Sequence, residues 1–395
     1  EAGHDPTEPA RSGAYPYPPI SHEPRIQTVF DQLRQEGLSP FPSPMGIQLD
    51  ERAPLSSKCI RCDTCDGYPC LLHAKSDAEV VGVRPVMDRD NVTLVTETRV
   101  VRLETDGRGR RVDRVVAEGP EGPVEYRGDV VVVACGAVHS AALLLASASD
   151  AHPQGLANRS GQVGRNLMKH VLGSMLGVSP DTPNPTAFQK TLAVNDFYFG
   201  SPEFPHPMGN VQLMGRTTTE ALAGQEKRYA PLSLETVAAN AVDWWLTTED
   251  LPRPDNRVRL DRGRIVIDYR ENNTRAFEAL VRAWTGVLER LGEPCRPAPC
   301  GHYFNPHGVE DHVHEDGEGF FVTKMPVQSL GHQVGTCRFG RDPDASVLDV
   351  HCRAHDVDNL YVVDGSFFVS SAAVNPTLTI IANALRVGAH LTERL

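Results

Sequence analysis

The pattern of apolar residues predicts strands alternating with helices near both ends of the sequence. Val130–Val133 is a run of four β-branched residues that ends at Ala134-Cys135-Gly136, and a helix-compatible stretch, Ser140–Ser147, follows it. A buried strand that leads into a helix is typical of α/β proteins. Towards the C-terminus, Leu360–Val363 predicts a second short strand, and Asn375-Pro376 opens a helix with proline at the first helical position.

Apolar residues at helical spacing also predict which helix faces are buried. The C-terminal helix is expected to bury a stripe made of Leu378, Ile381, Leu385 and Leu391. The middle of the chain is rich in Pro and Gly and has one good helix, over Thr274–Leu291. Its expected buried residues are Phe277, Leu280, Val281, Trp284, Leu288 and Leu291.

Further elements are predicted in the first third of the chain. A helix around Arg25–Gln35 interrupts a Pro-rich segment. Strands are predicted over Asn91–Glu104, over Arg111–Ala117 after an Asp106-Gly107 turn, and over Val124–Tyr126.

Composition narrows the class of protein. The chain has 395 residues, 40 % apolar and 23 % charged, with a net charge of −12. This is typical of a globular protein of two or more domains, and the acidic balance argues against a nucleic-acid partner. The apolar stretch Val130–Ala148 is interpreted as a strand and a helix, so we expect no membrane span.

The chain has 33 arginines and only 6 lysines, which indicates a bacterial source with GC-rich DNA.

Four of the nine cysteines lie close together, as Cys59, Cys62, Cys65 and Cys70. The spacing C-x2-C-x2-C-x4-C can place three or four thiolates around a metal centre, either an iron–sulfur cluster or zinc. Buried thiols or a local disulfide explain the same residues, and both interpretations stay open. A chain of this size does not need a disulfide scaffold, so we expect a reducing, cytoplasmic location.

Three ordered motifs near the C-terminus carry a resemblance to a known family. They are Gly331–Gly340 (GHQVGTCRFG), Asp358–Ser366 (DNLYVVDGS) and Val374–Thr379 (VNPTLT). Together with Asn91–Leu103, Asp129–Ala141 and Gly155–His170 (GLANRSGQVGRNLMKH), they resemble the glucose–methanol–choline (GMC) oxidoreductases, which are flavoenzymes. The resemblance covers about Cys59–Leu395 and is weakest in the middle.

The resemblance implies an α/β (α+β) fold. Part of a Rossmann-like FAD-binding domain would be interleaved with a sheet-based substrate domain. Residues 1–75 would be a Pro-rich segment with the cysteine cluster, residues 76–165 and 326–395 parts of the FAD-binding domain, and residues 166–325 the substrate domain.

Family members begin with a strand–GxGxxG–helix unit that holds the FAD pyrophosphate at a helix N-terminus. This sequence contains no GxGxxG and begins at Glu1 rather than Met. We therefore expect it to be the C-terminal part of such an enzyme. Either a partner chain or the rest of a longer protein supplies the missing unit, or the chain does not hold FAD alone.

The resemblance also implies site residues. His332 and Asn375 match the catalytic pair of the family. Histidine can take a proton near neutral pH, and the Asn amide can orient a substrate oxygen by hydrogen bonding. The helix after Asn375 would favour negative charge on reduced flavin at its N-terminus. The residues implied to contact FAD are Val100, Cys135, Gly136, Asp364, Gly365, Pro376 and Thr377.

The expected function is FAD-dependent oxidation of a CH–OH group of a small alcohol, with sugars and glycosides as candidates. His332 would be the base, and the hydride would pass to flavin. In some GMC dehydrogenases, a small iron–sulfur centre near such a cysteine cluster passes electrons onward. Two alternatives remain: a GMC-type lyase that uses FAD structurally, and a non-catalytic subunit or fragment that completes a flavoprotein with a partner chain.

Overall fold

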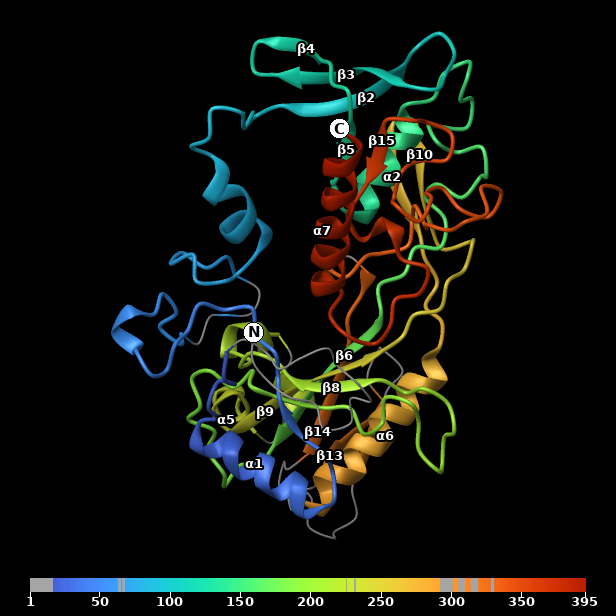
Figure 1. Ribbon diagram of the computed structural model, residues 1–395. Coiled ribbons are helices and arrows are strands. Elements are labelled where there is room, and N and C mark those ends of the chain that lie inside the picture. Colours follow the sequence, from blue (N-terminus) through green and yellow to red (C-terminus); the bar gives the residue numbers. More distant parts are fainter. Residues whose placement is uncertain are drawn as a thin grey trace. The chain divides into compact units, whose positions relative to one another are not determined.

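The computed structural model describes residues 17–62, 65, 68–224, 226–230, 232–291, 301–304, 310–313, 319–327 and 330–395. The chain forms two compact units, which Figure 1 shows in the colours of the sequence. Unit 1 holds residues up to Asp88 together with Val171–Thr248 and Thr274–Met325. Unit 2 holds Arg89–His170, Glu249–Asn273 and Pro326–Leu395.

Unit 1 is built on an antiparallel sheet. In the described residues its strands run in the order β1 (Phe41–Pro42), β7 (Leu192–Val194), β8 (Asn210–Leu213), β9 (Ala241–Thr248), β6 (Val171–Val178), β14 (Gly319–Lys324), β13 (Glu310–Val313) and β12 (Gly301–Phe304). Its helices are α1 (Pro24–Gln35), α3 (Thr219–Leu222), α4 (Glu226–Tyr229), α5 (Leu234–Asn240) and α6 (Thr274–Arg290).

The apolar face of α6 packs on this sheet, as its sequence predicts. The predicted residues from Phe277 to Leu288 are buried, and Leu291 is partly buried. Trp284 meets Trp244 of β9 edge to face, with 4.8 Å between the ring centroids. Because the helix buries large aromatic side chains against the longest strands, it fixes the core of unit 1.

Unit 2 contains a small parallel sheet in which β5 (Val131–Val133) pairs with β15 (Leu360–Val362). The helix α2 (Gly136–Ala146) follows β5, and a short helical turn, Gly365–Phe367, follows β15. The other strands of the unit form an antiparallel sheet of β2 (Arg99–Thr105), β3 (Val112–Gly119) and β4 (Gly122–Tyr126), and a hairpin of β10 (Arg257–Asp261) and β11 (Arg264–Asp268). The last helix is α7 (Thr377–Arg394).

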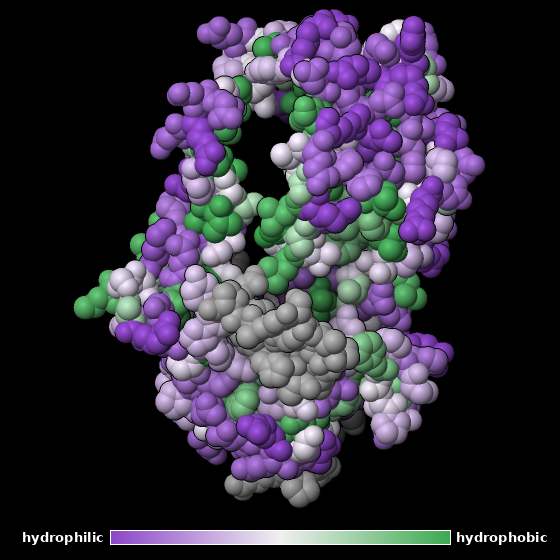
Figure 2. Space-filling view, viewed as in Figure 1, coloured by the Kyte–Doolittle hydropathy of each residue, from purple (hydrophilic) through white to green (hydrophobic). Residues whose placement is uncertain are grey.

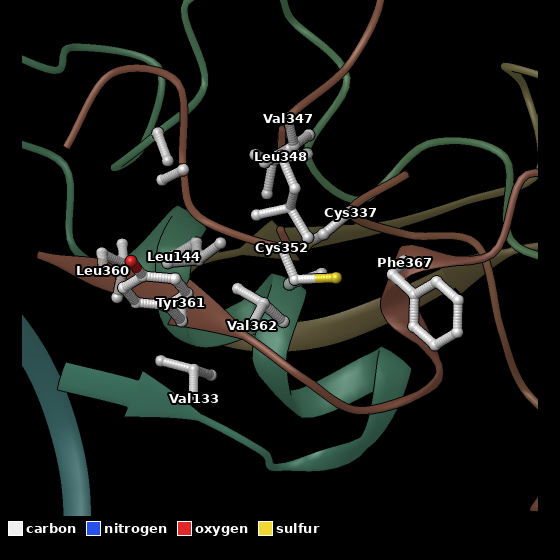
Figure 3. Close-up of a cluster of buried hydrophobic side chains, with 14 of the residues drawn as sticks. Val133, Leu144, Cys337, Val347, Leu348, Cys352, Leu360, Tyr361, Val362 and Phe367 are labelled. Atoms are coloured by element: carbon white, nitrogen blue, oxygen red, sulfur yellow. The ribbon is translucent and has the colours of Figure 1, made fainter. Parts of the chain in front are cut away.

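The core of unit 2 gathers around β15. Figure 3 shows Leu360, Tyr361 and Val362 beside Val133 of β5 and Leu144 of α2. These residues lie far apart in the sequence, so the parallel pairing of β5 with β15 brings the predicted FAD-binding segments together. The mixed α/β class predicted from the sequence is confirmed.

Three details of the predicted elements are wrong. The strand predicted from Asn91 begins only at Arg99, because the partner strand β3 ends at Gly119 and offers no hydrogen bonds further along. The helix α2 begins at Gly136, four residues earlier than predicted. Helix α7 begins at Thr377, with Pro376 at the N-cap.

The predicted buried stripe of α7 is wrong at two of its four residues, whereas Ile381 is half-buried and Leu391 packs partly buried against the core. Leu378 is 51 % exposed and Leu385 is 71 % exposed, whereas Asn383 and Val387 are the residues that the helix buries. The helix therefore turns a different face to the core of unit 2. Leu378 and Leu385 belong to an apolar face that the rest of this unit leaves uncovered.

Candidate active site

An antiparallel bridge between Met168 and Val334 places His170 beside His332. The N–H of Met168 donates to the carbonyl of Val334 at 3.0 Å, and the reverse bond measures 2.9 Å. In such a pair, the residue two positions after one bridge partner lies opposite the residue two positions before the other. The two imidazole rings accordingly meet edge to face, with centroids 5.1 Å apart and an interplanar angle of 83°.

Gly335 permits this close approach of the two segments. Its φ of +95° lies in the region that favours glycine, and a Cβ there would lie 2.4 Å from the carbonyl oxygen of Asn166. Its N–H donates to the carbonyl of Gly365 at 3.0 Å. The glycine therefore ties the segment that carries His332 to the turn after β15.

His170 also contacts the segment that precedes Asn375. Its Nδ1 lies 2.9 Å from the carbonyl oxygen of Ala372. A carbonyl only accepts hydrogen bonds, so Nδ1 is the donor. His170 and Ala372 both have positive φ values, +75° and +55° respectively. His332 is half-buried, whereas Asn375 is exposed.

His170 is a site residue that the sequence motifs do not single out. It is the last residue of the family motif Gly155–His170, so its position in that motif is the feature of the sequence that points to it. Its burial could not be read from that motif, since a histidine at the end of a polar segment is more often exposed. In the structure it is fully buried.

Burial controls the charge of His170. Desolvation, assisted by the nearby His332 and Lys169, lowers the pKa of His170 to about 3. His170 is therefore neutral near pH 7. With Nδ1 as donor, its Nε2 carries the lone pair.

Hydrogen bonds of Asp250 hold the segments that carry His170 and Ala372. Its carboxylate accepts hydrogen bonds from the backbone N–H of Lys169 at 3.0 Å and from the Tyr269 hydroxyl at 2.8 Å. The backbone N–H of Asp250 donates to the hydroxyl of Ser371 at 2.9 Å, and that hydroxyl donates back to the Asp250 carbonyl at 3.1 Å. Asp250 thus holds the residues directly before His170 and directly before Ala372.

Four of the residues predicted to contact FAD follow the carboxyl ends of β5 and β15: Cys135, Gly136, Asp364 and Gly365. Asp364 accepts hydrogen bonds from the N–H of Gly136 at 3.0 Å, from the hydroxyl of Ser140, and from the N–H of Ser366 at 2.8 Å. Cys135 and Gly136 are exposed, and a Cβ on Gly136 would have no neighbour within 4 Å. Crevices at the carboxyl ends of parallel strands are where α/β proteins bind nucleotides.

The start of α7 adds a second feature that fits an electron-rich group. Its N-cap is the buried Pro376, its first turn contains no acidic residue, and Thr377 is exposed. The first N–H groups of a helix favour negative charge. Val100, on β2, is 39 % exposed. Among the predicted FAD contacts, Val100, Cys135, Gly136 and Thr377 are exposed, whereas Asp364, Gly365 and Pro376 are buried and shape the turns.

The cysteine cluster does not form a metal site in the described part of the chain. No group of three or more His, Cys, Asp and Glu side chains among the described residues, which include Cys59, Cys62, Cys65 and Cys70, is placed to hold a metal ion. The backbone N–H of Ala74 donates to Sγ of Cys70 at 3.4 Å, and this bond is the main reason why the pKa of Cys70 is lowered. An iron–sulfur cluster or a zinc site is therefore not supported.

Comparison with known proteins identifies the family of this chain. Sequence profiles of the GMC oxidoreductase family match residues 44–172 and 252–384, which include the bridge between Met168 and Val334. The chain belongs to the GMC oxidoreductase family. FAD is the cofactor that this family implies.

Two family relatives come from Streptomyces. The 6'''-hydroxyparomomycin C oxidase of Streptomyces lividus is 32 % identical over 91 % of this chain and 62 % of its own length. The paromamine 6'-oxidase of Streptomyces fradiae is 33 % identical over 89 % of this chain and 61 % of its own length. The chain thus spans about three fifths of the length of these relatives.

The fold is similar to that of solved flavoenzymes of the family. A pyridoxine 4-oxidase structure from Mesorbium loti superposes with a TM-score of 0.63 at 20 % identity, covering 94 % of this chain and 70 % of that one. A formate oxidase structure gives a TM-score of 0.61. Among the described residues, no helix combines the length and the hydropathy that crossing a membrane requires.

Proposed function

We propose that this chain forms the catalytic part of an FAD-dependent oxidoreductase that oxidises a CH–OH group of a small alcohol. The observation that carries the proposal is the placement of His332 against His170, which itself is bonded to the segment leading to Asn375. One buried side chain thus contacts His332 and bonds to Ala372, three positions before Asn375, which supports assigning the two residues to one site.

In this proposal His332 accepts the proton of the substrate hydroxyl. An imidazole is suited to this task because its ordinary pKa lies near neutral pH. Asn375, which is exposed, donates a hydrogen bond from its amide to the substrate oxygen and orients it without competing for the proton. When bound, FAD supplies the acceptor for the hydride. Gly136, Asp364 and Thr377 are among the residues that would hold it.

The substrate class is proposed from the relatives. The names of the two Streptomyces relatives describe oxidation of paromamine and of a hydroxyparomomycin, which carry sugar hydroxyl groups. We propose an amino sugar or a related glycoside as the substrate. Paromamine is therefore the first compound to test, with pyridoxine and fructose as comparisons from more distant relatives.

We also propose that a further polypeptide carrying the nucleotide-binding unit completes the flavin site. Parallel sheets are normally covered on both faces, yet the described part of this sheet has two strands and Val132 of β5 is 46 % exposed. Leu378, Ala382, Leu385 and Ala389 form one exposed stripe along α7. In Figure 2, apolar side chains gather around the end of α7 away from the chain terminus. We call these four residues of α7 the completion face.

The test is anaerobic reduction of bound flavin by paromamine, measured by the loss of the visible flavin bands. We expect His332→Ala to slow reduction by at least a hundredfold while flavin content stays the same. His355→Ala is the control, because His355 bonds to Ser346 at 3.0 Å and has no role in the proposal. Normal reduction in His332→Ala would contradict the role of His332. Bound flavin that no alcohol reduces would favour the lyase, and no bound flavin under any condition would favour a non-catalytic subunit.

A further inference from the structure

His170 is a buried histidine in which one ring nitrogen makes a hydrogen bond and the other makes none to the described residues. Its Nδ1 donates to the carbonyl of Ala372, so in the neutral ring Nε2 is a lone-pair acceptor. Nε2 is buried, and no hydrogen bond reaches it from the described residues. A buried acceptor without a donor is costly, so its retention calls for an explanation.

The ring of His332 is the aromatic neighbour of the His170 ring. The two rings are in edge-to-face contact at 5.1 Å, and Nδ1 of His332 is a buried ring nitrogen as well. Both rings are held by backbone: the bridge between Met168 and Val334 sets their register, and Ala372 fixes the rotation of His170. His170 and Ala372 both have a positive φ. Residues other than glycine adopt this backbone conformation at an energetic cost, and such residues cluster at functional sites.

We propose that His170 is a positioning residue for His332: its fixed Nε2 lone pair stabilises the protonated form of the neighbouring ring. When the substrate proton moves to His332, the resulting imidazolium is in contact with a neutral, pre-oriented histidine ring that carries a lone pair. The proton stays on His332, because the pKa of His170 is far too low to take it. This inference rests on the proposed function only in assigning the proton to His332.

The charged groups around His170 do not account for stabilisation of protonated His332. Nζ of Lys169 donates to the carbonyl of His170 at 3.1 Å, and its positive charge disfavours a second cation nearby. The N–H of Lys169 and the hydroxyl of Tyr269 both donate to Oδ2 of Asp250, and its Oδ1 is buried with no hydrogen-bond partner among the described residues. The carboxylate of Glu249 accepts the N–H of Ala372. Unlike these charged groups, His170 has a ring that contacts His332, and this ring carries the lone pair.

The test is a titration of the histidine rings by ¹⁵N NMR on the chain as purified, without substrate. Spectra of His170→Gln and His332→Gln assign the two residues. We expect His170 to show one protonated and one unprotonated ring nitrogen from pH 5 to pH 9, while His332 titrates. Titration of His170 near pH 6.5 would overturn the proposal.

Substitutions at His170 separate positioning from packing. His170→Asn keeps a donor that can reach Ala372 but has no acceptor at the ε position, so we expect the titration midpoint of His332 to fall by about one pH unit, a tenfold loss of proton affinity. His170→Gln places an amide oxygen near the ε position and should restore most of the midpoint. Equal midpoints in the wild type and His170→Asn would overturn the proposal, and so would equal shifts in both variants.

This titration distinguishes the inference from the proposed function. It needs no turnover, so the positioning role can hold even if no alcohol reduces the flavin. In the flavin-loaded enzyme, the same one-unit shift is expected in the pH dependence of flavin reduction for His170→Asn. A lower rate with an unchanged pH profile would indicate a packing role and would overturn the proposal.

Discussion

The carboxylate of Asp364 accepts a hydrogen bond from the backbone N–H of Gly136, which lies 228 positions earlier in the chain. The same carboxylate also accepts bonds from Ser140 and Ser366. One buried side chain therefore joins the turn after β5 to the turn after β15. These are the turns at which the flavin is proposed to bind.

Replacing this carboxylate should loosen both turns. In Asp364→Asn, the amide nitrogen would face backbone and hydroxyl donors, so at least one buried donor would lose its acceptor. We expect the free energy of unfolding to fall by about 2–3 kcal/mol. Urea denaturation followed by circular dichroism measures this change. Asp358→Asn is the matched control, because Asp358 is half exposed and pairs with Arg110 at the surface, where about 0.5 kcal/mol is expected. Similar losses in both variants would contradict the joining role of Asp364.

Gly335 should tolerate no side chain. In Gly335→Ala the added Cβ meets the carbonyl of Asn166 at 2.4 Å and the positive φ adds strain. We expect a loss of about 2 kcal/mol or more in the free energy of unfolding, together with weaker contact between His170 and His332. Gly388→Ala, in the open on helix α7, should instead stabilise the protein by up to about 1 kcal/mol. If Gly335→Ala is as stable as the wild type, the bridge between Met168 and Val334 is not as close as described.

The completion face predicts that substitutions at two nearby residues of α7 change the free energy of unfolding by different amounts. Leu385→Lys changes an exposed position and should leave the stability of the chain within about 0.5 kcal/mol. Val387→Ala removes buried apolar volume and should cost about 2 kcal/mol. Thermal unfolding measures both. Loss of flavin or of a co-purifying polypeptide in Leu385→Lys alone would agree with the completion face, whereas retention of both would count against it.

Asp243 of β9 should make stability depend on pH. Its complete burial raises its pKa to about 6, although Gln189 donates to its carboxylate at 2.8 Å. Between pH 4 and pH 6 the folded state therefore holds a proton that the unfolded state has released. The free energy of unfolding from this group falls as pH rises through that range, by on the order of 2–3 kcal/mol.

Asp243→Asn removes this contribution, so its unfolding free energy should decline less between pH 4 and pH 6.5 than that of the wild type. Asp255→Asn, at an exposed position, serves as the control and should follow the wild-type curve. Denaturant midpoints at several pH values measure the two slopes. Parallel curves for the wild type and Asp243→Asn would show that this carboxyl group titrates normally.

The sequence by itself determined the family, the α/β class and most of the elements. The β-branched run of β5 and the helical spacing of α6 predicted those elements because local patterns report which face is buried. The ordered motifs named His332, Asn375 and Asp364. The domain limits at residues 75, 165 and 325 and the roles of the site residues stay predictions.

The tertiary structure alone decided which side chains meet. His170 lies 162 positions from His332 in the sequence, and only the pairing of Met168 with Val334 brings their rings together. The exposed face of α7 could not be predicted either, because periodicity shows that a helix is amphipathic but not which partner covers each side. Contacts between distant segments depend on register and burial, which a local pattern of residues does not encode.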